Sequence, residues 1–312
     1  MMLQHKIKTS KELLAEFEEK NLNIRGEKLN FIGAQGKDVY NITAPFEDEG
    51  DLIIAGRVES RDSEISEVCF FKYKNGSWVK RENTITLSLQ DPFVSIINGE
   101  IVLGGVEIYP HLTIENALGY RTAFYRGNTI NDLKKFTKGP EMMKDIRLME
   151  FPNGKIAVFT RPQGKVGGKG TIGFITINNL DELNAAVIEK APLIQNQFID
   201  EEWGGANEVH ILKNGLIGVL GHIASFDNIG NRHYYPMTFA FNMETKEASS
   251  IKIIATRKNL PAGDYKRKDI IDVIFSGSII RKENAKAELY CGVSDAEAHM
   301  ILIDDPFLEY EI

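Results

Sequence analysis

Short runs rich in Val, Ile, Leu and aromatic residues alternate with turn residues along most of the chain. Asn-Gly pairs at residues 98–99, 153–154 and 214–215 each lie between two such runs. An Asn-Gly pair in this setting is the strongest short-range signal for a β-hairpin. The sequence therefore predicts three hairpins, over residues 91–107, 145–162 and 207–224.

The same two-strand plan recurs with longer turns over residues 38–59 and 272–295. The five starts are 53 to 65 residues apart, which leaves room in each unit for two outer strands. Five such units predict an all-β fold, a five-bladed β-propeller whose innermost strands line a central channel. A β-sandwich, or two small β domains, is the alternative.

Helical patterns are few. The segment SKELLAEFEEK predicts an N-terminal helix with Ser10 as its N-cap, and residues 132–136 and 180–188 predict short helices between blades. No low-complexity linker divides the chain. We predict a short helical appendage over residues 1–30 and one propeller domain over residues 31–312.

Composition and charge narrow the range of partners. The net charge of −7 and pI near 5.5 do not favour a nucleic acid or an anionic membrane surface. No stretch approaches the roughly 20 apolar residues that span a bilayer, and the first residues lack the apolar core of a signal peptide. Cys69 and Cys291 lie in apolar runs that favour buried thiols over a disulfide. We expect a cytoplasmic protein, and a homo-oligomer remains open.

The propeller geometry brings polar residues together. The start of a hairpin's first strand and the end of its second lie at the same end of the sheet, so both should reach one mouth of the channel. The residues that open the five units are Asp38, Asn41, Asp91, Lys144, Asp145, Asn207, Glu208 and Asp272. Those that close them are Arg57, Glu107, Arg161, His222 and Asp295. This set predicts a polar ligand site on the axis, without the CxxC or HExxH spacing of a metal site.

Each of these side chains also has a structural alternative as a turn cap or an inter-blade ion pair. Beside Arg161, the Gly- and Lys-rich stretch 160–170 offers backbone N–H groups, Lys165 and Lys169 to an anion, or is a solvated loop. Tyr234 lies in a polar aromatic stretch, and Trp203 either stacks on a sugar or wedges between blades.

Several motifs resemble a known family. The segments GPEMMKDIRLMEFPNGKIAVFTRPQG, EEWGGANEVH, GHIASFD, RHYY, RKDIIDVIFSG and YCGVSDAEA are similar to a group of bacterial and Leishmania proteins associated with mannosyltransferases and phosphorylases of β-1,2-mannans. A more distant similarity connects the chain to the family-130 β-mannoside phosphorylases, which are five-bladed propellers. Its motifs resemble Gln90-Asp91-Pro92-Phe93, Lys144-Asp145, Arg161-Pro162, Leu220-Gly221-His222 and the stretch from Tyr290 to Asp295.

This resemblance implies a role for four of the residues already placed at the mouth. Asp91 matches the family's general acid, Arg161 and His222 match its phosphate ligands, and Asp295 matches a sugar contact. Two positions depart from the family pattern, because Gln90 replaces a glutamate and Phe93 replaces an arginine. Lys144 is added to the predicted phosphate site, together with Arg121 as the second arginine, for which Arg126 is the alternative.

The resemblance thus predicts inverting phosphorolysis of a β-mannoside, or the reverse mannosyl transfer, with inorganic phosphate as co-substrate and no other cofactor. The residues expected to bind the sugar are Asn41, Asp145, Asn207, Glu208, Tyr234, Asp272 and Asp295. A glycoside hydrolase is the alternative enzyme, with Glu208, Asp145 or Asp272 as its base. A non-catalytic carbohydrate-binding propeller is the alternative outside enzymes.

Overall fold

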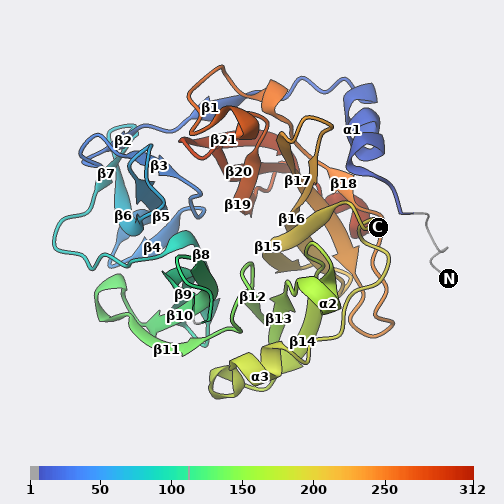
Figure 1. Cartoon of the computed structure of the whole chain (residues 1–312), viewed down its shortest axis with the longest axis horizontal. Helices are drawn as coiled ribbons and strands as arrows, with labels where there is room; N and C mark the ends of the chain where they lie inside the picture. The colour runs from blue at the N-terminus through green and yellow to red at the C-terminus, as the bar shows by residue number, and fades with distance from the viewer. Residues whose placement is uncertain (1–6, 112) are drawn as a thin grey trace.

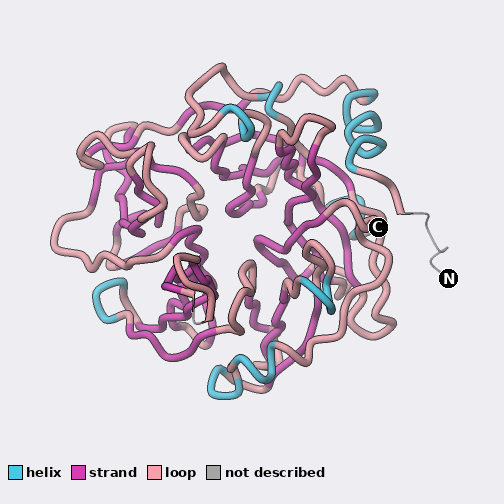
Figure 2. Tube along the Cα trace, viewed as in Figure 1, coloured by secondary structure: helices cyan, strands magenta, loops and turns pink. Residues whose placement is uncertain are grey.

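The strands form five separate sheets arranged in a ring around a common axis, which confirms the predicted five-bladed propeller (Figure 1). The computed structural model describes residues 7–111 and 113–312. Figure 2 shows that the helical turns lie mainly toward the outside of this ring. Three of the sheets have all their strands in chain order from the innermost strand outward, and the first and fifth sheets differ in that their outermost strands, β2 and β1, come from an earlier part of the chain.

The blades follow one another along the chain. The first blade contains β3 (Asp38–Tyr40), β4 (Phe46–Asp48), β5 (Asp51–Glu59), β6 (Ser66–Lys74), β7 (Ser77–Lys80) and β2 (Phe31–Ile32). The second contains β8 (Gln90–Ile97), β9 (Glu100–Pro110), β10 (Leu118–Gly127) and β11 (Lys134–Lys138). The third contains β12 (Arg147–Glu150), β13 (Ile156–Thr160) and β14 (Gly173–Ile177). The fourth contains β15 (Trp203–Ile211), β16 (Ile217–Phe226), β17 (Arg232–Phe241) and β18 (Lys252–Ile253).

The fifth blade closes the ring with a strand from the other end of the chain. It contains β19 (Ile274–Arg281), β20 (Lys286–Val293), β21 (Glu297–Asp304) and, outermost, β1 (Gly26–Lys28). β1 pairs antiparallel with β21, with Gly26 opposite Ile301. Residues 26–28, which we assigned to the appendage, are therefore part of the propeller.

The N-terminal helix α1 (Ser10–Glu19) packs on the outside of the fourth blade (Figure 1). Its N-cap is Thr9, one residue before the predicted Ser10, and Thr9 forms a capping box with Glu12. Leu13 and Phe17 are buried in the hydrophobic cluster between the third and fourth blades. The other helical segments are α2 (Gly164–Gly167), α3 (Ala185–Ile188), η1 (Ile130–Asp132), η2 (Leu180–Glu182), η3 (Arg257–Asn259), η4 (Lys268–Ile270) and η5 (Leu308–Tyr310).

Apolar side chains of neighbouring blades pack face to face around the ring. One cluster joins the first two blades through Phe70 and Leu103, and a cluster between the fourth and fifth blades contains Leu220 and Leu289. The channel is thus surrounded by rigid packed walls. Cys69 and Cys291 are free and buried, as predicted. No helix in the described part of the chain is long and apolar enough to cross a membrane.

Candidate active site

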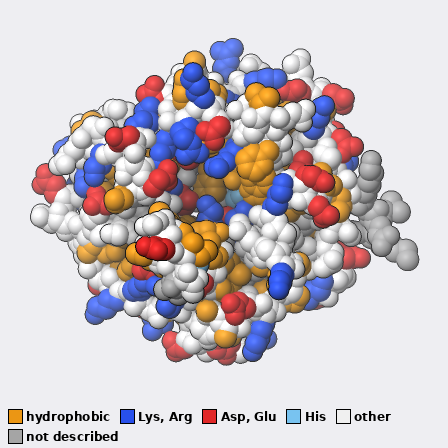
Figure 3. All heavy atoms as spheres, in the orientation of Figure 1, with side chains coloured by type: hydrophobic (Ala, Val, Ile, Leu, Met, Phe, Trp, Pro, Cys, Tyr) orange, Lys and Arg blue, Asp and Glu red, His pale blue; other side chains and the backbone are white. Residues whose placement is uncertain are grey.

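A polar pocket of about 180 Å³ lies on the axis of the propeller, where all five blades contribute to its lining. In Figure 3 a hollow opens at the centre of the face, with Lys and Arg side chains in and around it. Eight residues predicted from the sequence line this pocket: Asn41, Asp91, Lys144, Asp145, Arg161, His222, Tyr234 and Asp295. Arg57, named above as a unit-closing residue, lines it as well.

The predicted site residues Arg121, Asp272, Asn207 and Glu208 do not line the pocket, and neither do Asp38 and Glu107 from the set of residues that open and close the units. Arg121 lies on β10, opposite Glu107 on β9, and pairs with Glu107 and Glu141 at 2.7 Å each. Asp272 accepts a hydrogen bond from the Tyr235 hydroxyl (2.7 Å) and lies 2.6 Å from His233 Nδ1. Asn207 and Glu208 line a second cavity, of about 310 Å³, together with Phe93 and Arg147. Arg126 reaches Asp181 rather than the pocket.

The backbone at the start of the inner strands turns polar side chains toward the axis. Asn41, Asp91 and Asp145 have left-handed backbone angles, with φ of 44°, 49° and 59°. Asn and Asp tolerate this conformation best among residues with a side chain. At Asp91 it coincides with a break in the β8–β9 register between Gln90 and Phe93, a bulge of the kind that redirects side chains.

Asp91 is held as a carboxylate by two donors. Arg57 Nη1 lies 3.1 Å and Asn41 Nδ2 2.7 Å from its Oδ1. Burial alone would raise the pKa of Asp91, but the Arg57 guanidinium and the Lys144 ammonium outweigh it and hold that pKa below its usual value. Asp91 is therefore ionised at neutral pH in the free protein.

The pKa of Asp295 is shifted in the opposite direction to that of Asp91. Burial raises its pKa, and the neighbouring charge of Asp91 raises it further against the lowering effects of Arg57 and Lys266. The described residues provide no hydrogen bond or ion pair to its side chain. Two carboxyl groups facing one pocket, with their pKa values moved apart, is the arrangement that keeps one proton available.

Cations gather around Asp145 on the third blade. Arg161 Nη1 lies 3.3 Å and Arg147 Nη2 3.9 Å from the Asp145 carboxylate. Burial opposes ionisation of Asp145, but Arg161 and Lys144 lower its pKa to about 2. Burial also opposes the charge on Lys144, whose pKa is nevertheless raised by Asp145 and Asp91. Lys144 makes no hydrogen bond or ion pair with the described residues, so its ammonium group is available to a ligand.

His222 and Tyr234 form the wall contributed by the fourth blade. Their rings stack with centroids 5.4 Å apart, and the Tyr234 hydroxyl accepts a hydrogen bond from Trp203 Nε1 (3.0 Å). His222 Nδ1 lies 2.8 Å from the side-chain amide of Asn207. Burial, more than the nearby Arg161 and Lys144, lowers the pKa of His222 to about 3, so the ring is neutral. Trp203 is buried against Phe226 and supports Tyr234 from behind the pocket.

Comparison with known proteins identifies the family of this chain. A model of the family described as "Protein of unknown function (DUF1861)" matches residues 15–309. The chain belongs to this family. A search of the curated proteins found no significant match.

Solved structures with high similarity include two proteins from Leishmania mexicana. A mannose phosphorylase in complex with phosphate ion is 33% identical, with 97% of this chain and 95% of that chain covered and a TM-score of 0.89. A GDP-Man-dependent mannosyltransferase is also 33% identical, with 97% and 96% covered and a TM-score of 0.87. A β-1,2-mannobiose phosphorylase from Listeria innocua shares the fold at 14% identity, with 89% and 93% covered and a TM-score of 0.63. The resemblance noted from the motifs is thus confirmed.

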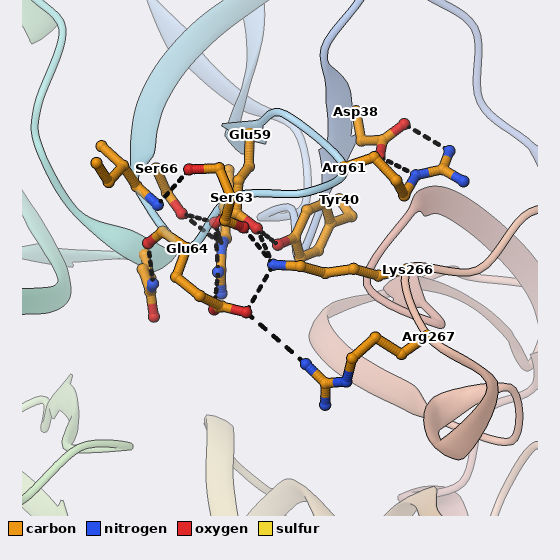
Figure 4. A network of polar contacts seen from close by, with 12 residues as sticks. Asp38, Tyr40, Glu59, Arg61, Ser63, Glu64, Ser66, Lys266 and Arg267 are labelled. Carbon is orange, nitrogen blue, oxygen red and sulfur yellow. Dashed lines mark hydrogen bonds and ion pairs between the residues drawn. The ribbon is translucent and has the colours of Figure 1, made fainter.

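This DUF1861 member also has two cations that the sequence did not predict, Arg267, which lines the pocket, and the adjacent Lys266. Figure 4 shows Lys266 reaching Glu59 and Glu64 from the loop before the fifth blade, and Arg267 reaching Glu64. Glu59 in turn binds Arg57 Nη2 at 2.6 Å, so the network anchors the arginine that holds Asp91. Both cations lie in a loop between blades. The repeat of strands predicted only residues at strand ends, so it did not predict these two. The run Lys266-Arg267-Lys268 was the available signal.

The Gly- and Lys-rich stretch contributes less than expected. Lys165 and Lys169 do not line the pocket, and Lys169 Nζ donates to the Glu201 carbonyl (2.9 Å). Within the described residues, no group of three His, Cys, Asp or Glu side chains converges in the manner of a metal site.

Proposed function

We propose that this chain moves mannosyl groups between a β-mannoside, β-1,2-linked, and inorganic phosphate with inversion of configuration. The observation that carries the proposal is that Lys144 and Arg161 present cations to the same pocket as the carboxyl groups of Asp91 and Asp295. The phosphate-bound mannose phosphorylase that is 33% identical over 97% of this chain supports the same reading. Phosphate is then a co-substrate, and no other cofactor is required.

Phosphate binds on the third-blade side of the pocket. Lys144 has no protein partner in the described chain, and Arg161 Nη1 has an ion pair with Asp145 but no hydrogen bond. Arginine and lysine are the usual phosphate ligands of proteins, because their donors are charged. His222 lines the same pocket and completes the anion site.

In the forward step, a phosphate oxygen forms a bond to the anomeric carbon while the bond from that carbon to the glycosidic oxygen breaks. The leaving oxygen takes the proton of the carboxyl pair, and the products are α-mannose 1-phosphate and the shortened saccharide. A hydrolase needs a second carboxylate to activate water, whereas phosphate arrives already ionised. The reverse direction uses the same groups and transfers mannose to an acceptor.

Proton delivery belongs to Asp91 and Asp295 together. Of the two, Asp295 binds a proton more readily in the free protein, because burial and Asp91 raise its pKa while Arg57 and Lys144 lower that of Asp91. Bound phosphate neutralises Lys144 and so raises the pKa of Asp91, which then acts as the general acid. Asn41 and Tyr234 line the same pocket and remain as sugar-binding groups.

The hydrolase alternative has less support. Of its three proposed bases, Glu208 and Asp272 lie outside the pocket, and Asp145 has its pKa lowered to about 2, which makes it a weak base. A carbohydrate-binding protein without activity would have no use for two carboxyl groups in one pocket whose pKa values are shifted in opposite directions, as those of Asp91 and Asp295 are.

The deciding experiment incubates the protein with β-1,2-mannobiose, with and without inorganic phosphate. We expect mannose 1-phosphate only when phosphate is present. Free mannose in both samples would show that the reaction is hydrolysis and not phosphorolysis. Binding without turnover, unchanged in Asp91→Asn, would refute the catalytic reading. A third sample with GDP-mannose and mannose as acceptor separates transfer from a sugar nucleotide.

A further inference from the structure

The imidazole of His222 is fixed from behind by two neighbouring blades. Its Nδ1 lies 2.8 Å from the side-chain amide of Asn207 on β15. The same amide lies 3.1 Å from the hydroxyl oxygen of Ser276 on β19. Asn207 and Ser276 are buried, with 2% and 0% of their surface exposed, so water does not compete for these contacts.

The hydroxyl proton of Ser276 is already committed. Ser276 Oγ lies 2.8 Å from the carbonyl oxygen of Gly221, which can only accept a hydrogen bond. Two oxygens at this distance need a proton between them, and Ser276 supplies its single one. Toward Asn207, Ser276 Oγ therefore has only lone pairs to offer and requires a donor there.

The oxygen and nitrogen of an asparagine amide have nearly the same shape, so the surrounding hydrogen bonds decide which of them faces a given neighbour. With the oxygen of Asn207 toward Ser276, two acceptors would face each other and the buried amide nitrogen would lack a partner. With the nitrogen there, its two protons serve Ser276 Oγ and His222 Nδ1 together. Either orientation leaves one end of the buried amide without a partner, but only the second turns the contact with Ser276 from two facing acceptors into a hydrogen bond, which favours the second orientation.

We infer that Asn207 turns its amide nitrogen toward Ser276 and His222 and so holds His222 in the tautomer with its proton on Nε2. His222 has no other hydrogen bond to the described residues, and its ring lines the pocket. Since the ring is neutral, it carries one proton, which must lie on Nε2 when Nδ1 accepts. His222 then presents a donor to the same space as Arg161 and Lys144.

Asn207 and Ser276 are therefore positioning residues, which lie behind the pocket and act through His222. With the opposite tautomer, a bare Nε2 would face bound phosphate and repel its ionised oxygens. The value of this inference for catalysis rests on the proposed function, but the tautomer itself can be measured without any substrate.

The test uses the full chain labelled with ¹⁵N-histidine and long-range ¹H–¹⁵N correlation spectra at neutral pH. The His222 signals are identified by their loss in His222→Gln. We expect the protonated-nitrogen shift at Nε2 and the bare-nitrogen shift at Nδ1. The reverse pattern would overturn the inference. If the spectra show the expected pattern but calorimetry detects no binding of phosphate, the tautomer inference stands and the proposed phosphate site is refuted.

Two variants test the mechanism. Asn207→Asp replaces the donor by a carboxylate, so the proton should move to Nδ1. Ser276→Ala frees the amide to rotate, and phosphate binding should weaken about tenfold while the KM for the sugar stays constant. Ser278→Ala is the matched control, because Ser278 is also buried but lies across the strand bulge and lines the second cavity. An unchanged His222 pattern in Asn207→Asp would contradict the assignment even if Ser276→Ala failed to fold.

Discussion

Arg57 holds Asp91 in a buried ion pair, with Arg57 Nη1 3.1 Å from Asp91 Oδ1 and 5% and 6% of the two residues exposed. The arginine is itself anchored by Glu59, which also binds Lys266 from the fifth blade. Removing one partner of such a pair leaves an uncompensated buried charge, which costs about 3–5 kcal/mol. The charge on Asp91 is thus a property of the network across the first, second and fifth blades.

The pair of carboxyl groups predicts different pH profiles for two conservative variants. Asp91→Asn should lose turnover by about 10²–10⁴-fold, the usual contribution of a general acid, while phosphate still binds. In Asp295→Asn only Asp91 can hold the proton, and Arg57 keeps the pKa of Asp91 low. Activity is lost as pH rises through the pKa of the group that holds the proton. The alkaline limit of activity in Asp295→Asn should therefore move to lower pH.

The measurement is kcat/KM against pH for mannose 1-phosphate release, because this ratio follows the protonation of groups in the free protein. Asp264→Asn is the control, because Asp264 pairs with Arg61 at the exposed rim and its side chain is 69% exposed. Its profile should match the unmodified protein. An alkaline limit in Asp295→Asn that stays where it is in the unmodified protein would remove Asp295 from proton delivery.

Arg161 should act on phosphate and not on sugar. Arg161→Lys keeps a cation beside Asp145 but loses the fixed planar donors of the guanidinium. We expect the KM for phosphate to rise about tenfold or more, with the KM for the mannoside within about twofold. Steady-state kinetics with each substrate varied in turn gives both values.

Arg121→Lys is the matched control for that experiment. Arg121 is the same residue type and was predicted for the same role, but it pairs with Glu107 and Glu141 away from the pocket. Neither KM should change in this variant. Equal increases of both KM values in Arg161→Lys would mean that Arg161 supports the pocket as a whole.

The sequence predicted the parts of this structure that depend on local chemistry. The hairpin turns follow from Asn-Gly pairs, and Asp91, Asp145 and Asp295 were found because strand ends of a repeat must meet at one mouth. Residues 134–138 instead form the edge strand β11, since pairing with β10 overrides the helical pattern there. Arg121 was misplaced because strand register, which the repeat does not specify, sets it opposite Glu107.

His222 predicts a loss of stability in mild acid. Burial holds its pKa near 3 in the folded protein, against an ordinary value of 6.5. Between these values the unfolded chain binds a proton that the folded protein does not, so stability falls as pH drops from about 6.5 to 3. The contribution is at most about 5 kcal/mol.

Denaturant unfolding at several pH values between 4 and 7 measures this effect. The slope of unfolding free energy against pH should be smaller in His222→Gln than in the unmodified protein. His111→Gln, on the loop after β9, should keep the original slope. If His222→Gln has the original slope as well, the ring is not buried as a neutral group.

The closure of the ring depends on Gly26. A Cβ atom at this position would lie 2.4 Å from Leu260 Cδ2 and 2.9 Å from Ile301 Cγ1, so a side chain at residue 26 forces these neighbours to move where β1 pairs with β21. Gly26→Leu should lower the unfolding free energy by about 1–3 kcal/mol, the usual cost of overpacking, or detach β1 and expose the edge of β21. Glu27→Ala changes an exposed side chain of the same strand and should stay within about 0.5 kcal/mol. Because β1 is the only strand that the first 30 residues add to a blade in the described chain, equal stability of the two variants would mean that the fifth blade holds without it.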